Sequence, residues 1–242
     1  MNAIEIKGLT KRYRDVTAVD RLSLSVKEGE LFSLLGVNGA GKTTTIKMLS
    51  CLTHPSEGDA LLLGKSIEKE PAAVKELIAV SPQETAVAPT LSVLENLKLM
   101  AGVHGFSRDK QGERIQELTQ LLGLTNVLSK KAGKLSGGYQ RRLSIAMALI
   151  SEPRILFLDE PTLGLDVIAR SELWDLIRAL KGGVTIILTT HYMEEAEALS
   201  DRIAIMKDGR LLTCDTAEAI KKAAGTASFE EAFIRTVKGE TK

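Results

Sequence analysis

A glycine-rich segment of nine residues, Gly36-Val-Asn-Gly-Ala-Gly-Lys-Thr-Thr44, has the residue types that hold a triphosphate. It fits the spacing G-x-x-x-x-G-K-[ST], with an apolar run before it and a helical pattern after it. Glycines let the backbone turn tightly, so that its N–H groups converge on an anion. The helix after Gly41 also directs its positive N-terminal end at that anion. The phosphate contacts expected from this segment are Gly36, Val37, Asn38, Gly39, Ala40, Gly41, Lys42, Thr43 and Thr44.

Two side chains of this segment have more specific roles. Lys42 is expected to place its charge at the β- and γ-phosphates, and the Thr43 hydroxyl is expected to bind Mg²⁺. The alternative is a glycine-rich turn that carries a lysine by chance, and the strand and helix patterns on either side argue against it.

A pair of carboxylates, Asp159 and Glu160, directly follows the apolar run Ile155-Leu-Phe-Leu158. In open α/β sheets, ligands bind at the carboxyl ends of the strands. Asp159 suits a second contact to magnesium, and Glu160 suits a group that orients and polarises the attacking water. Acids at strand ends are often only solvated, but together with the phosphate-binding segment they predict a Mg-dependent ATPase.

A second anion-binding segment is expected at Ser136, Gly137 and Gly138, which precede a helical stretch that runs to Ile150. Serine followed by two glycines at a helix start gives another set of convergent N–H donors. Serine is also a common helix N-cap, so this pattern alone is modest evidence. One nucleotide needs one cradle. A second cradle therefore suggests that another subunit closes the site.

These segments must be positioned by an α/β framework. Strands alternate with helices along much of the chain, which predicts a parallel sheet covered on both faces. We expect strands at 3–7, 22–26, 31–35, 60–63 (as an edge strand), 78–80, 155–158, 185–188 and 202–206. We expect helices at 44–52, 72–77, 91–100, 112–122, 143–150, 168–180 and 194–199.

The organisation changes between residues 84 and 153, where helical apolar spacing recurs without a convincing strand. We interpret 84–153 as a helical subdomain inserted into a core made of residues 1–83 and 154–215. The tail, 216–242, is mildly amphipathic and is assigned no element.

Composition restricts the classes of partner. The 242 residues include 32 Lys plus Arg and 31 Asp plus Glu, so no long-range attraction to nucleic acid or anionic lipid is expected. Cys51 and Cys214 are far apart and have no metal-ligand spacing. No signal peptide is visible, and no segment approaches the roughly 18 apolar residues of a membrane span. Work at a membrane would therefore require docking onto a protein that spans it.

The motifs together resemble those of the ATP-binding subunits of ABC (ATP-binding cassette) transporters, over nearly the whole chain. Residues 36–44 match Walker A, 155–159 match Walker B, and 135–140 resemble the signature motif. The resemblance implies that Tyr13 stacks on adenine, that Gln83 contacts magnesium and signals to a membrane partner, and that His191 contacts the γ-phosphate. Leu163-Gly-Leu-Asp166 resembles the D-loop. Tyr139 stands where the signature more often has glutamine, and the D-loop lacks its usual serine.

The resemblance also implies a fold and partners. The expected fold is an α/β, RecA-like P-loop NTPase core with a mostly parallel sheet, an N-terminal antiparallel β subdomain and the inserted helical subdomain. Two copies are expected to pair head to tail around two ATP molecules, so that Ser136 of one faces the nucleotide held by Lys42 of the other. The homodimer would work with a transmembrane permease, on the cytoplasmic face of the cell membrane.

The direction of transport is suggested by two segments. Residues 189–197 and the tail segment 228–234 resemble the subfamily that exports drugs, lipids or polysaccharides. An importer subunit and a soluble ABC ATPase that works on ribosomes or DNA remain alternatives. A GTPase would need a guanine-reading Asn-Lys-x-Asp, which the chain lacks. The transported substrate cannot be read from this chain, because contacts to it would lie in the permease.

Overall fold

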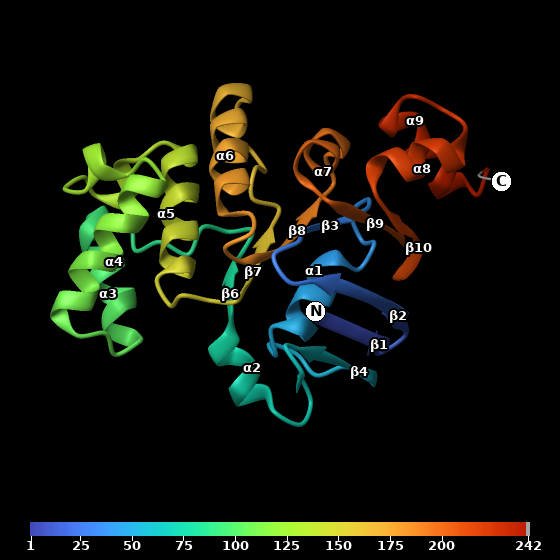
Figure 1. Ribbon diagram of the computed structural model, residues 1–242, viewed down its shortest axis with the longest axis horizontal. Coiled ribbons are helices and arrows are strands. Elements are labelled where there is room, and N and C mark those ends of the chain that lie inside the picture. Colours follow the sequence, from blue (N-terminus) through green and yellow to red (C-terminus); the bar gives the residue numbers. More distant parts are fainter. Residues whose placement is uncertain (241–242) are drawn as a thin grey trace.

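A six-stranded sheet forms the centre of the molecule in a computed structural model that describes residues 1–240 (Figure 1). The strand order is β10-β9-β3-β8-β7-β6, and all neighbours are parallel except β10, which pairs antiparallel with β9. The prediction of a mostly parallel sheet is therefore confirmed. Its strands are β3 (Leu31–Leu35), β6 (Ile78–Ser81), β7 (Ile155–Asp159), β8 (Thr185–Thr190), β9 (Arg202–Lys207) and β10 (Arg210–Asp215).

Successive side chains of these strands enter two different cores, because residues of a strand alternate between the faces of its sheet. Phe32 and Phe157 pack on the face that is covered by α1 (Lys42–Leu49) and by a second, antiparallel sheet. Leu156 and Leu188 pack on the other face, against helices. Both faces are thus buried, which explains why the central strands are continuous apolar runs.

The second sheet has the order β2-β1-β4-β5 and consists of antiparallel pairs. Its strands are β1 (Asn2–Tyr13), β2 (Val16–Lys27), β4 (Glu57–Leu62) and β5 (Lys65–Ser66). The prediction of an edge strand at 60–63 is wrong in one respect. After Leu63 and Gly64, both at positive φ, the chain returns as the short strand β5, so β4 has a partner on each side.

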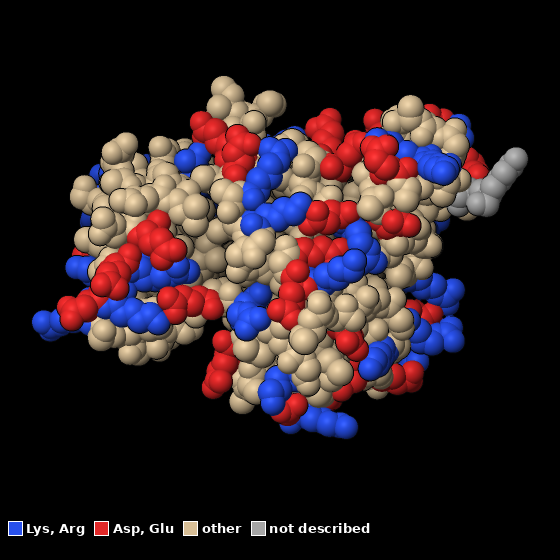
Figure 2. Space-filling view, viewed as in Figure 1, with Lys and Arg blue, Asp and Glu red and all other residues tan. Residues whose placement is uncertain are grey.

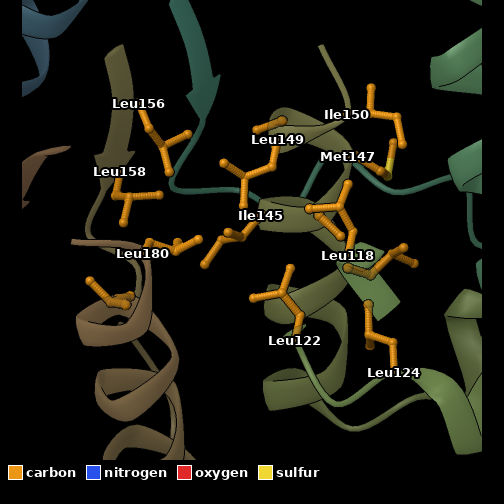
Figure 3. Packing of buried hydrophobic residues seen from close by; sticks show 14 of the residues in the cluster. Leu118, Leu122, Leu124, Ile145, Met147, Leu149, Ile150, Leu156, Leu158 and Leu180 are labelled. Carbon is orange, nitrogen blue, oxygen red and sulfur yellow. The ribbon is translucent and has the colours of Figure 1, made fainter. Parts of the chain in front are cut away.

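Helices fill the connection between β6 and β7. They are α3 (Val93–Val103), α4 (Arg108–Leu121) and α5 (Gly137–Leu149), with two short 3₁₀ segments at Thr125–Val127 and Ala132–Lys134. Figure 3 shows that Ile145 and Leu149 of α5 lie between Leu158 of β7 and Leu118 of α4. The helix α5 therefore joins this helical end of the molecule to the sheet, and it begins six residues before the predicted start at 143.

The remaining helices are α2 (Pro71–Leu77), α6 (Val167–Leu180), α7 (Met193–Leu199), α8 (Ala217–Ala224) and α9 (Phe229–Lys238). The last two form the tail, which sequence reasoning did not place. Phe229 and Phe233 of α9 pack with Leu35 and Ile205 in a third apolar cluster, so the tail supports the strand that leads into the phosphate-binding segment.

Charges of both signs are mixed on the face of the molecule that Figure 2 displays, where Lys and Arg are interspersed with Asp and Glu. Within residues 1–240, no helix combines the length and apolar character that crossing a membrane requires.

Candidate functional site

A cavity of about 780 Å³ lies at the carboxyl ends of the central strands. This volume is within the usual range for small-molecule sites. It brings together segments that are far apart in the sequence: the loop after β3, Gln83 after β6, Glu160 after β7 and His191 after β8. The residues lining it are Val16, Thr17, Ala18, Asn38, Gly39, Ala40, Gly41, Lys42, Thr43, Thr44, Gln83, Glu160, Leu163, His191 and Asp208.

The glycine-rich loop is shaped by close backbone contacts. Gly41, the N-cap of α1, has φ +98°, and a Cβ there would lie 2.5 Å from the carbonyl oxygen of Ala18. A Cβ on Gly36 would lie 2.5 Å from the carbonyl oxygen of Met206. No side chain fits at either position. The backbone of the loop therefore packs directly against the backbones of β2 and β9, which fix its conformation. The cavity then meets the N-terminal end of α1, where free N–H groups favour an anion.

Lys42 lies inside this loop with only 5% of its side chain exposed. Its Nζ donates to the carbonyl oxygens of Gly36 at 2.7 Å and Val37 at 3.3 Å, and lies 3.7 Å from Glu160 Oε1. Burial lowers the pKa of Lys42, while Glu160 and Asp159 oppose this shift because they favour the charged form. Gly36 and Val37 are therefore partners of the lysine and do not line the cavity.

Asp159 lies behind the cavity wall and receives two hydroxyl donors. Thr43 Oγ1 donates to its Oδ1 at 3.2 Å, and Thr189 Oγ1 donates to the same oxygen. Thr189 is opposite Asp159 in the pairing of β7 with β8, so the sheet register sets this contact. Hard oxygen donors from Thr43, Asp159 and Gln83 suit Mg²⁺, which keeps several waters and phosphate oxygens as ligands. Within residues 1–240, no group of three or more His, Cys, Asp or Glu side chains is placed to hold a metal.

Glu160 and His191 lie next to each other in the wall of the cavity. His191 Nδ1 lies 3.2 Å from Glu160 Oε1, yet this buried nitrogen has no partner of hydrogen-bond geometry in the part of the chain that the structure describes. The Glu160 backbone has φ +46°, an uncommon value for a residue with a side chain. The site therefore contains one carboxylate that both Lys42 and His191 approach.

Other predicted site residues lie at its edge or outside it. Gln83 lines the cavity, but Tyr13, 45% exposed at the end of β1, does not. Strand β2 lines the cavity near this point with Val16, Thr17 and Ala18. The stacking of Tyr13 on adenine therefore stays a prediction. Helix α5 begins with Gly137 and Gly138 after its N-cap, Ser136, and none of these three residues lines the cavity. Their role as a second anion-binding segment stays a prediction.

Sequence reasoning missed two buried charged residues beside the site. The Arg141 guanidinium donates to backbone carbonyls around Asp159 and Gln83, and burial lowers its pKa to about 10. Glu195 is fully buried in α7, where its Oε1 accepts from Thr162 Oγ1 at 2.8 Å and Trp174 Nε1 at 3.0 Å. Both lie on the buried faces of their helices, and a charge at such a position is the signal that could have identified them.

The chain is similar to known ATP-binding proteins of transporters. A family model described as ABC transporter matches residues 19–163. The daunorubicin/doxorubicin resistance ATP-binding protein DrrA of Streptomyces peucetius is 42% identical over 225 residues, covering 93% of this chain and 68% of that protein. A Nod factor export ATP-binding protein I of Burkholderia orbicola is 43% identical over 208 residues, covering 86% and 68%.

Solved structures agree with these matches. An ATP-binding subunit of an ABC transporter superposes with a TM-score of 0.85 at 29% identity, covering 97% of this chain and 99% of that one. A dimeric ATP-binding cassette in a post-hydrolysis state with ADP and Pi superposes with a TM-score of 0.78 at 28% identity, covering 88% and 98%. The predicted P-loop NTPase fold and the resemblance are both confirmed.

Proposed function

The chain belongs to the ABC transporter family, and from this membership we propose that it is the ATP-hydrolysing subunit of an exporter whose pathway is a separate transmembrane permease. The chain is an ABC-type ATPase that binds nucleotide. The observation that carries the finer proposal is the cavity in which the phosphate loop, Gln83, Glu160 and His191 meet. Export is supported by relatives named for drug resistance and for Nod factor export.

In this proposal, different residues of the cavity bind the phosphates, bind magnesium and align the attacking water. The loop amides and Lys42 hold the phosphates, and Thr43, Asp159 and Gln83 hold Mg²⁺, which would neutralise charge on the phosphates. Glu160 accepts a hydrogen bond from the attacking water and aligns it, while His191 donates to the γ-phosphate. Tyr13 is assigned to the adenine ring.

The second anion-binding segment, Ser136 to Gly138, is proposed to complete the site of a second copy. A dimeric cassette among the similar structures supports this arrangement. ATP would then favour the closed dimer, since it contacts both copies only in that state. The helical subdomain, proposed for residues 84–153, would transmit closure to the permease on the cytoplasmic face of the membrane.

The proposal is tested with Lys42→Ala and Glu160→Gln. Lys42→Ala is expected to lose both nucleotide retention and phosphate release. Glu160→Gln is expected to retain ATP, to hydrolyse it at least about 100-fold more slowly and to accumulate as a dimer on gel filtration. Glu152→Gln, an exposed acid on the loop before β7, is the matched control and is expected to behave as wild type. Wild-type turnover by Glu160→Gln would refute the assignment of Glu160.

A separate experiment addresses the partner. Affinity purification of the chain from membranes is expected to recover a protein with about six hydrophobic spans. Recovery with ribosomes or DNA instead would favour a soluble ABC ATPase.

A further inference from the structure

We propose that Arg141 is a positioning residue for hydrolysis: its guanidinium holds the backbone around Glu160 and links it to the segment that carries Gln83. This inference rests on the proposed role of Glu160 in orienting water. Arg141 lies in α5, outside the cavity, and none of the motif roles above requires it.

The Glu160 backbone needs such support. Its φ of +46° lies in the left-handed region, which residues with a side chain rarely adopt unless their surroundings enforce it. The backbone N–H of Glu160 donates to both the carbonyl oxygen and Oγ1 of Thr189, each at 3.1 Å. Its own carbonyl oxygen accepts from the N–H of Leu163 at 3.2 Å. These hydrogen bonds fix the Glu160 backbone itself. They do not involve the carbonyl groups of its two sequence neighbours, Asp159 and Pro161.

Arg141 holds both of those flanking carbonyls. Its Nη2 donates to the Asp159 carbonyl oxygen at 2.6 Å, and its Nε donates to the Pro161 carbonyl oxygen at 2.8 Å. One planar group thus bonds the carbonyl oxygens of the two residues that flank Glu160 in the sequence. Because the guanidinium is rigid, it sets the distance between these two carbonyls and thereby the turn that presents the Glu160 side chain.

The third nitrogen of the guanidinium reaches a different loop. Nη1 donates to the Pro82 carbonyl oxygen and approaches the Gln83 carbonyl oxygen at 3.4 Å. A shift of the Gln83 segment would therefore pull on the same group that holds Glu160. The geometry connects the residue proposed to signal to the permease with the residue proposed to align water.

The bonding pattern of Arg141 also distinguishes it from an ordinary core ion pair. Only 3% of the residue is exposed, and buried arginines usually pair with a carboxylate. In the part of the chain that the structure describes, no carboxylate lies within salt-bridge distance of Arg141. Its hydrogen bonds go to backbone oxygens of two loops of the site.

The first test compares Arg141→Met, which removes every donor but keeps an unbranched apolar stem, with Arg141→Lys, which keeps the charge but can bond fewer carbonyls. We expect Arg141→Met to lower kcat about 100-fold with KM for ATP changed less than about threefold, because misplacement affects the reacting geometry more than binding. Arg141→Lys is expected to be intermediate. Arg114→Met is the control, because Arg114 also bonds a backbone carbonyl, that of Leu149 at the far end of α5, but lies away from the site. Wild-type kcat in Arg141→Lys would overturn the inference even if Arg141→Met does not fold.

The second test is a double-mutant cycle with Glu160→Gln, measured as single-turnover rates. If Arg141 acts through Glu160, Arg141→Met is expected to slow the wild type about 100-fold but to add less than about threefold in the Glu160→Gln background. The same slowing in both backgrounds would show a general structural role and would overturn the inference. If Glu160→Gln alone hydrolyses ATP as fast as wild type, the proposed function fails, which is a separate result.

Discussion

Replacing Thr189 with valine removes one hydroxyl that serves both carboxylate residues of the site. The side chain is fully buried, its Oγ1 donates to Asp159 Oδ1, and it accepts from the Glu160 N–H. Valine has nearly the same shape, so the substitution leaves no cavity. The change therefore isolates the hydrogen bonds.

The magnitude follows from which groups lose a partner. A hydrogen bond to a charged group contributes about 1.5–3 kcal/mol. The Glu160 N–H keeps the Thr189 carbonyl oxygen, and Asp159 keeps the Thr43 hydroxyl, so neither group is left unpaired. Burying a methyl group in place of the hydroxyl returns about 0.8 kcal/mol. We therefore expect a loss of about 1–2 kcal/mol in the free energy of unfolding, which lowers Tm by about 2–8 °C in a chain of this size.

The assay is urea unfolding followed by the fluorescence of Trp174, the only tryptophan in the chain. Thr185→Val is the matched control, since Thr185 is buried in the same strand and its Oγ1 accepts from the Gly29 N–H at 3.0 Å, far from the site. Thr185→Val is expected to destabilise by about 0.5–1.5 kcal/mol and to leave kcat unchanged. Thr189→Val is expected to lower kcat as well. If the two variants agree in both stability and kcat, the reasoning about Asp159 and Glu160 is refuted.

Two further predictions concern residues outside the phosphate loop, Glu195 and Gly58. Burial raises the pKa of Glu195, so the folded state binds a proton on this carboxylate more readily than the unfolded state does. Proton binding therefore stabilises the fold, fully below the unfolded pKa of about 4.3, and this stabilisation is lost as pH rises through the folded pKa. Glu195→Gln, which can still accept from Thr162 and Trp174, should therefore gain stability over wild type in urea unfolding at pH 8 relative to pH 5, and an equal difference at both pH values would contradict this. Gly58→Ala should lower the free energy of unfolding by at least about 2 kcal/mol, because Gly58 has φ +79° and a Cβ would lie 2.3 Å from the Gly8 carbonyl oxygen; an unchanged Tm would show that the β1–β4 contact is looser than described.

The parts of the fold that the sequence predicts are those that depend on a continuous local pattern. Apolar runs mark β3, β7, β8 and β9, because these strands are buried on both faces. The strand β10 was missed, since it is an edge strand with exposed positions, although the turn Asp208-Gly209 between β9 and β10 is a hairpin signal.

The site divides in the same way. The residues that line the cavity and belong to motifs, such as Lys42 and Glu160, could be predicted because their chemistry requires a fixed local spacing. Arg141 and Glu195 could not, because their partners are set by packing between helices and loops that are remote in the sequence. Helix α5 begins at Gly137 despite two glycines and although the Ser136 side chain makes no capping hydrogen bond, because tertiary packing overrides weak helix propensity.

The position of β3 in the sheet has a consequence for biosynthesis. Its two neighbours, β8 and β9, both lie beyond residue 184, and the tail helices that cover Leu35 come later still. A chain emerging from the ribosome can form the β1–β2 hairpin early, but β3 has no partner until β8 is complete at Thr190, and it lacks its second neighbour until β9 is complete at Lys207. For most of translation, β3 is thus an apolar strand without a partner. Unpaired apolar strands are prone to aggregate, so chaperone binding or rapid folding after synthesis would protect this chain.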